Sequence, residues 1–188
     1  MSRLKSERLE NIVAHEKLKE ALHYVIENCD DASRLGAIRL NKIMWFADCH
    51  AYRENALTIS GDGYVKRKFG PVPKHVLAAL RELQDEGKIV VREVPYSTRK
   101  TFREFISVVI PATRELSDVD KKCLKGYTDI ICTEFTAAGI SEASHDQVWE
   151  AADEGEEIPM YTIFAGQPGP ITDEVRSWAN EVTARLAA

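Results

Sequence analysis

The sequence predicts an α+β fold that is mostly helical: a helical core with a small antiparallel β-hairpin or sheet and a winged-helix-like central part. Helices are predicted because apolar residues recur at three- and four-residue steps in several segments. The hairpin is predicted because two stretches rich in Val, Ile and Phe, 88–94 and 101–110, flank the polar link 96–100. A helix before this hairpin gives the winged-helix-like order.

The first part of the chain is predicted to hold two helices. A polar start over residues 1–14, which we expect to fray, leads into a helix over 16–28. Polar residues at 30–33 can cap the second helix, which ends near Asn55.

Glycine and proline mark the next segment. Gly61 and Gly63 break the helical pattern before a short strand at 64–69. The Gly-Pro-Val-Pro run that follows is predicted to turn the chain, with Pro73 in the first turn of a third helix over 73–86.

The last part of the chain is predicted to be helical again. Ser117 caps a helix that Gly139 ends. Ser144, with a glutamine three residues later, has the spacing of a capping box for a short helix. We therefore predict one domain over 1–167, followed at 168–188 by a linker and an amphipathic helix.

Two parts of the chain carry a family resemblance. Leu-Asn-Lys-Ile-Met-Trp-Phe-Ala-Asp, then Ile-Ser-Gly-Asp-Gly-Tyr, Gly-Pro-Val-Pro and a later Ser-His-x-x-x-x-Trp, resemble in this order the Panacea domain of SocA-like antitoxins of bacteria and phages. The resemblance covers about residues 18–164, so the domain over 1–167 is Panacea-like. The matching positions are Lys42, Phe46, Ala47, Asp48, Gly61, Tyr64, Gly70, Pro71, Val72, Pro73, Ser144, His145 and Trp149.

The resemblance implies an antitoxin of a bacterial or phage-associated toxin–antitoxin system. Such a protein neutralises a cognate toxin by direct contact, and for some family members the toxin is delivered to a AAA+ protease. The candidates for family-motif and partner-binding residues are Lys42, Asp48, Gly61, Tyr64, Lys66, Lys68, Gly70, Pro71, Pro73, His145 and Trp149.

A DNA-binding transcriptional regulator is the alternative function. Arg99, Lys100 and Arg103 lie near the predicted tip of the wing, where basic side chains can meet phosphates. Against this alternative, the preceding helix carries Lys74 and Arg81 but three acidic residues, which is weak for a recognition helix.

Charge is distributed unevenly along the chain, whose net charge is −5. Residues 63–103 contain ten Lys and Arg against four Asp and Glu, and residues 141–188 contain two Arg against ten acidic residues. Such asymmetry indicates either a partner surface or two segments that face each other within the fold.

No catalytic, cofactor or metal site is predicted. The sequence contains no phosphate-binding loop, nucleophile elbow or zinc-peptidase helix motif. Asp48 and His50 are two residues apart on a helix, so they point in different directions and cannot bind one ion by themselves. An unrecognised enzyme is a third hypothesis, which would need a pocket that holds Asp48, His50 or His145 with a bound ion or substrate. Cys49 with a remote histidine could also form a nucleophile–base pair.

Several other conspicuous residues are interpreted as structural. His145 is predicted to tether backbone beside Trp149, and the four cysteines, which lack metal-site spacing, are predicted to be reduced and mostly buried. A set of aromatic residues is predicted to pack in the core rather than form a ligand box: Trp45, Phe46, Tyr52, Tyr64 and Phe69.

We expect a cytoplasmic protein, because no signal peptide and no apolar run of membrane-spanning length is present. The end of the chain, Leu186-Ala-Ala188, resembles tails that AAA+ proteases recognise, although alanines also simply extend a helix. Replacing Ala187 and Ala188 with Asp is expected to lengthen the cellular half-life if the tail is a degradation signal.

Overall fold

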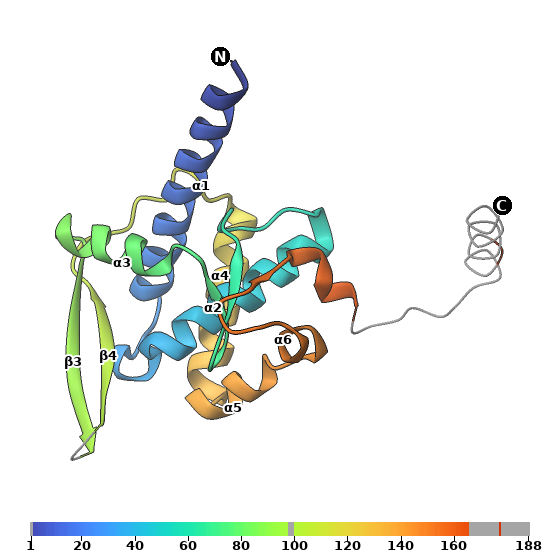
Figure 1. The fold of residues 1–188 in the computed structure, drawn as a ribbon. Coiled ribbons are helices and arrows are strands. Elements are labelled where there is room, and N and C mark those ends of the chain that lie inside the picture. Colours follow the sequence, from blue (N-terminus) through green and yellow to red (C-terminus); the bar gives the residue numbers. More distant parts are fainter. Residues whose placement is uncertain (1, 98–99, 166–176, 178–188) are drawn as a thin grey trace.

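The computed structural model describes residues 2–97, 100–165 and 177, and it is built mainly of helices with two small antiparallel sheets (Figure 1). This confirms the predicted α+β, mostly helical fold class. The helices are α1 (Ser2–Glu27), α2 (Ala32–Asn55), α3 (Val76–Asp85), α4 (Asp118–Glu134), α5 (Ala137–Ala143), α6 (Gln147–Ala151) and the 3₁₀ helix η1 (Met160–Phe164). The strands are β1 (Tyr64–Arg67), β2 (Gly70–Pro73), β3 (Ile89–Ser97), β4 (Lys100–Ser107) and β5 (Glu157–Ile158).

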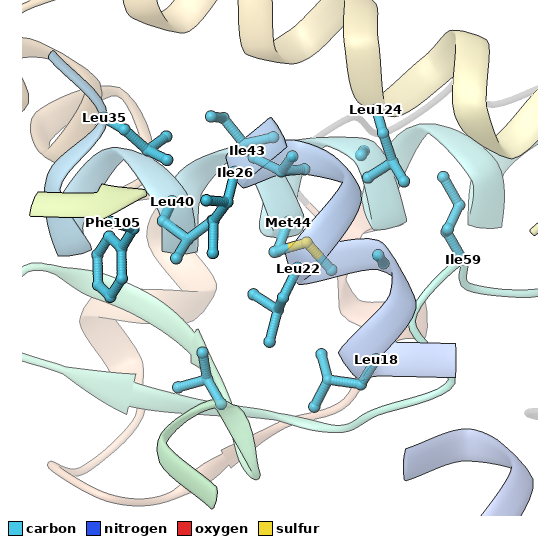
Figure 2. Packing of buried hydrophobic residues seen from close by; sticks show 14 of the residues in the cluster. Leu18, Leu22, Ile26, Leu35, Leu40, Ile43, Met44, Ile59, Phe105 and Leu124 are labelled. Atoms are coloured by element: carbon cyan, nitrogen blue, oxygen red, sulfur yellow. The ribbon is translucent and has the colours of Figure 1, made fainter. Parts of the chain in front are cut away.

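Helix α2 lies at the centre of the molecule, in contact with α1, α4, α5, β2 and β4 (Figure 1). Its apolar side chains meet those of α1, α4 and β4 in the main hydrophobic core (Figure 2). A smaller second cluster lies around Trp45 and Tyr64 and includes Ile158 and Ile163. Figure 2 labels ten members of the main core: Leu18, Leu22, Ile26, Leu35, Leu40, Ile43, Met44, Ile59, Phe105 and Leu124.

The ends of α2 follow from local sequence. Asp31 caps the first turn by accepting a hydrogen bond from the backbone N–H of Ser33, as predicted for residues 30–33. An interruption near the start was not predicted: Gly36 has φ 55° and ψ 164°, which bends the chain. A Cβ on Gly36 would make only ordinary contact, 3.9 Å from the Phe102 ring of β4, so the positive φ is what favours glycine here.

The first sheet has the strand order β2-β1-β5 and corrects one prediction. The Gly-Pro-Val-Pro run is a strand, because Val65 pairs with Val72 and Tyr64 pairs with Pro73. The chain reverses just before this run, and helix α3 begins only at Val76. Placing Pro73 in the first turn of a helix was therefore wrong: Pro73 lies at an edge strand, where its missing N–H is tolerated.

The second sheet is the predicted hairpin of β3 and β4, in which Val91 pairs with Phe105. A register shift occurs between Pro95 and Ser97. Strand β4 packs on α2 and α1, and α3 contacts β3. Helix, hairpin and supporting helices thus follow the winged-helix-like order that the sequence predicts.

Three boundaries beyond the hairpin depend on caps. Ser117 caps α4 in a full capping box with Asp120, as predicted for Ser117. Gly139 does not end α4, which stops at Glu134; it lies inside the separate helix α5. Ser144 does not cap α6 either, because Asp146 accepts the hydrogen bond from the Trp149 N–H, at 2.8 Å, while Ser144 ends α5.

Two further predictions concern the ends of the chain. Helix α1 begins at Ser2 rather than near residue 16, so the backbone of the expected frayed start is helical. The predicted linker and helix over 168–188, like the tail 186–188, lie outside the described residues apart from residue 177. No helix in the described ranges has the length and apolar character needed to span a lipid bilayer.

Candidate functional site

The Lys42 side chain occupies a buried junction between α2, β2 and α5. Its ammonium Nζ donates a hydrogen bond to the carbonyl oxygen of Pro71 at 3.0 Å, and the residue is 1% exposed. Burial lowers the pKa of Lys42 to about 7, because a desolvated ammonium is less stable than a neutral amine. Lys42 is therefore held inside the fold rather than presented to a partner.

Gly70 makes this junction possible. Its φ is 99°, which side chains rarely adopt, and a Cβ here would overlap Lys42 Nζ and Ser144 Oγ. The serines of α5 complete the packing: Ser141 Oγ donates to the carbonyl of Phe69 at 3.0 Å, and Ser144 Oγ donates to the carbonyl of Ser141 at 2.7 Å. Ser141 thus ties α5 to the β1–β2 turn, and the family-type serine at 144 bonds back to it.

Asp48 forms a second buried centre one and a half turns along α2. Its carboxylate accepts hydrogen bonds from the Ser60 N–H at 2.9 Å, the Ser60 hydroxyl and the Tyr64 hydroxyl at 2.7 Å. Burial raises the pKa of Asp48, while the hydrogen bonds from Ser60 and Tyr64 oppose that shift. The carboxylate fixes the loop from α2 to β1.

His145, Trp149 and Lys66 form a stacked group beside these two centres. The His145 and Trp149 rings are parallel, with centroids 3.7 Å apart, and Lys66 Nζ lies 4.3 Å from the centroid of the Trp149 ring. Lys66 also donates to the carbonyls of Glu150 and Ala152 at the end of α6, and the indole N–H of Trp149 donates to the Arg67 carbonyl at 3.2 Å.

The sequence predicted that the His145 ring tethers neighbouring backbone. In the structure the ring does not do so. Among the described residues its Nε2 is the buried side-chain polar atom left without a hydrogen-bond partner. Burial lowers the pKa of His145. A neutral ring stacked on Trp149 is the consequence.

The basic and acidic parts of the sequence face each other within the fold. Strand β5 pairs with β1, so Lys74 Nζ lies 3.2 Å from Glu157 and Arg67 Nη1 lies 3.8 Å from Glu154. This bears out the second interpretation of the charge asymmetry for these segments. Both pairs are exposed, so each contributes little to stability.

The remaining motif candidates have separate roles. Gly61 has φ 69°, and a Cβ there would lie 3.2 Å from the Cβ of Ala14 on α1, so it permits a close approach. Lys68 is exposed at the β1–β2 turn, with Nζ 5.5 Å from the Phe69 ring centroid. Phe69 is 51% exposed, so its predicted place in the core was wrong, whereas Trp45 and Tyr64 are buried as predicted.

The contact between Asp62 and His75 was not predicted from the sequence. Asp62 Oδ1 lies 2.7 Å from His75 Nδ1, and Asp62 Oδ2 accepts the His75 backbone N–H at 2.8 Å. Because His75 is the N-cap position of α3 and makes no cap bond of its own, Asp62 supplies that cap from a distant loop. The pair borders a cavity of about 490 Å³ between α1 and the β1–β2 region.

The wing candidates are only partly described. Lys100 begins β4, and Arg99 lies outside the described residues. Arg103 is exposed and lies opposite Glu93 in the hairpin. Arg92 pairs with the carboxylate of Glu104. The described part of the hairpin therefore carries both signs of charge.

The fold does not support an ion site made by Asp48 and His50, and it does not support a nucleophilic Cys49. His50 is exposed and lies 3.4 Å from the Tyr127 hydroxyl, away from the buried Asp48. Burial raises the pKa of Cys49, which disfavours the thiolate, the nucleophilic form of cysteine. In the part of the chain that the structure describes, no group of three or more His, Cys, Asp and Glu residues could hold a metal ion.

A groove of about 680 Å³ runs between the C-terminal half of α2 and α4. Its wall contains two exposed apolar side chains of α4, Val119 at 72% and Ile130 at 46% exposure. Tyr127 lies between them, and its ring stacks on Phe46 of α2 with centroids 6.3 Å apart. The sequence analysis missed this groove, although Val119 and Ile130 lie off the apolar stripe of the α4 pattern and could have signalled it.

Comparison with known proteins gives one family. The family model described as antitoxin SocA-like, Panacea domain, matches residues 40–150, which is more than half of the chain. Neither the curated proteins nor the solved structures contain a match. The matched range includes both buried centres, the stacked group and the groove between α2 and α4.

Proposed function

The chain belongs to the SocA-like antitoxin family with a Panacea domain, and from this premise we propose that it neutralises a cognate toxin by direct protein contact. Family membership is the observation that carries the proposal. We propose a binding protein rather than an enzyme, because Asp48, Lys42 and Tyr64 are buried and occupied by internal hydrogen bonds. Protease-linked turnover stays an expectation from the family resemblance.

Because the motif residues are buried, the residues that support the domain differ from those that contact the toxin. Lys42, Asp48, Tyr64 and Gly70 are buried, so a partner cannot reach their side chains in the folded protein. Contact with the toxin would therefore use exposed residues outside the motif. The motif then serves function by fixing where α2, α5 and the β1–β2 turn lie.

We assign toxin contact to the groove between α2 and α4. It is concave, and its exposed Val119 and Ile130 would be covered by an apolar side chain or helix of the toxin, which favours association. Glu54, Asp120 and Lys122 at the groove supply both charge signs for the polar edge of such a contact.

The test uses the product of the neighbouring gene as the candidate toxin. Expressed alone it should stop growth, and coexpression of this protein should restore growth and permit copurification of the two. The double variant Val119→Lys with Ile130→Lys should fail in both assays. Val90→Lys, at a β3 valine outside the groove that is about as exposed as Ile130, is the control and should behave like wild type.

Two results would contradict the proposal at different levels. If the candidate toxin is harmless without this protein, the antitoxin function is wrong for this gene pair. If the double variant keeps its thermal midpoint and still binds and protects like wild type, the groove is not the toxin-binding surface.

A further inference from the structure

Two free cysteines from distant parts of the sequence meet where α1 ends and α4 ends. The Sγ atoms of Cys29 and Cys132 are 3.6 Å apart, although 103 positions separate them in the chain. Cys29 lies in the irregular link between α1 and α2 and is half-exposed. Cys132 lies in the last turns of α4 and is buried.

Other contacts hold the two segments together independently of the thiols. Arg34 Nη2 donates to the carbonyl of Thr133 at 2.8 Å, and Arg39 donates to the carbonyl of Phe135 at 2.8 and 3.1 Å. These guanidinium groups of α2 bind carbonyls at the C-terminal end of α4, where cations are favoured. The two sulfurs therefore stay neighbours while the link that carries Cys29 can adjust.

The local chemistry makes Cys29 the attacking thiol. The contact between the two thiols lowers the pKa of Cys29 and raises the pKa of Cys132, and Cys29 is also the more exposed of the two. Since the thiolate is the nucleophile in disulfide exchange, Cys29 reacts first and Cys132 follows. The other two thiols differ, because burial raises the pKa of both Cys49 and Cys123.

We propose that Cys29 and Cys132 are a reversible redox site that closes to an intramolecular disulfide by exchange with a small disulfide of the glutathione class. The Cys29 thiolate attacks one sulfur of the small disulfide, and one small thiolate leaves. Cys132 then loses its proton and attacks Cys29 Sγ, which expels the second small thiol. Two protein thiols are oxidised, and the small disulfide is reduced to two thiols.

Closure requires only a short movement. A disulfide bond is about 2.05 Å long, so the sulfurs must approach by about 1.5 Å, which the non-helical link of Cys29 can supply. The closed loop would then span most of the domain and join the α1–α2 link to the end of α4. Such a long crosslink restricts the unfolded chain and raises the thermal midpoint.

The experiment treats the full chain with oxidised glutathione and then alkylates the remaining thiols. Intact mass should show two alkylated cysteines and no glutathione, and peptide mapping should join Cys29 to Cys132. The thermal midpoint should rise by about 5–15 °C and return with dithiothreitol. The variant Cys49→Ser with Cys123→Ser should form the same crosslink and show no alkylated cysteine, whereas Cys132→Ser should retain glutathione on Cys29.

Three results would overturn the proposal. One is wild-type protein with four alkylated cysteines after treatment. Another is a lasting glutathione adduct on wild-type Cys29, since Cys132 should remove it. The third is a crosslink that survives in Cys132→Ser.

Discussion

At the scale of single residues, the most unusual feature of the motif is the burial of the Lys42 amine. Lys42 keeps an amine inside the protein with one carbonyl acceptor, that of Pro71. Its neighbours Ser144 and His145 supply no negative charge, and the His145 ring is stacked on Trp149. The charged form of Lys42 therefore opposes folding, and the neutral form does not.

This gives a pH prediction for Lys42. Its pKa is about 7 in the folded protein and 10.5 as the ordinary value, so between these values the unfolded state binds more protons. The free energy of unfolding therefore rises with pH in this window. Between pH 7 and pH 8, the free energy of unfolding of wild type should rise by about 1 kcal/mol relative to that of Lys42→Met, measured by urea unfolding. Parallel curves for the two proteins would contradict a neutral buried Lys42.

Gly70 permits a second prediction with an internal control. Gly70 and Gly87 both have positive φ, but the space beside Gly87 is open, whereas a Cβ on Gly70 overlaps Lys42 and Ser144. Gly87→Ala should lower the free energy of unfolding by about 1–2 kcal/mol through backbone strain alone. Gly70→Ala should cost at least about 2 kcal/mol more, because buried Lys42 cannot move without losing its acceptor. Equal losses in denaturant unfolding would show that the junction is not tightly packed.

At the scale of elements, caps decide where the short helices begin. Asp146 rather than Ser144 holds the first turn of α6, and α6 carries Trp149 into its stack with His145. Helix α6 has five residues, so its cap satisfies a large share of its free N–H groups. The cap thus contributes to the stacked group and to the position of Lys66 above it.

The cap of α6 is testable with a conservative pair. Asp146→Ala should destabilise the protein by about 1 kcal/mol, because the Trp149 N–H loses its acceptor. Asp146→Ser retains an acceptor and should restore most of the loss, measured by thermal unfolding together with Trp fluorescence. No difference between the alanine and serine variants would mean that Asp146 acts through its charge instead of as a cap.

At the scale of the whole molecule, the two hydrophobic clusters set the extent of the described core. In the part of the chain that the structure describes, the buried apolar residues of both clusters lie between Leu18 and Ile163. The matched family range lies inside this stretch. The domain boundary near residue 167 stays a prediction.

A chain that stops at Gln167 should therefore fold by itself. We expect one cooperative unfolding transition with a midpoint within about 3 °C of the full chain, because the described core loses none of its members. Scanning calorimetry of both chains is the measurement. A large drop in the midpoint, or loss of cooperativity, would place residues 168–188 in the domain.

The sequence by itself determined the features that depend on a few neighbouring residues. The Asp31 and Ser117 caps, the hairpin 89–107 and the helical stripes were predictable, because caps act over three residues and periodicity is read within one segment. The order of the Panacea-like motif also identified the family before the fold was known.

Tertiary structure alone decided what the motif residues do. Gly70–Pro73 is a strand because β1 lies beside it, and Lys42 is buried because Pro71, 29 positions away, offers its carbonyl. The positions of Cys29 and Cys132 in the sequence likewise do not indicate that the two thiols are neighbours. Burial, a shifted pKa and the approach of two thiols depend on which distant segments pack together, and local propensity does not specify that packing.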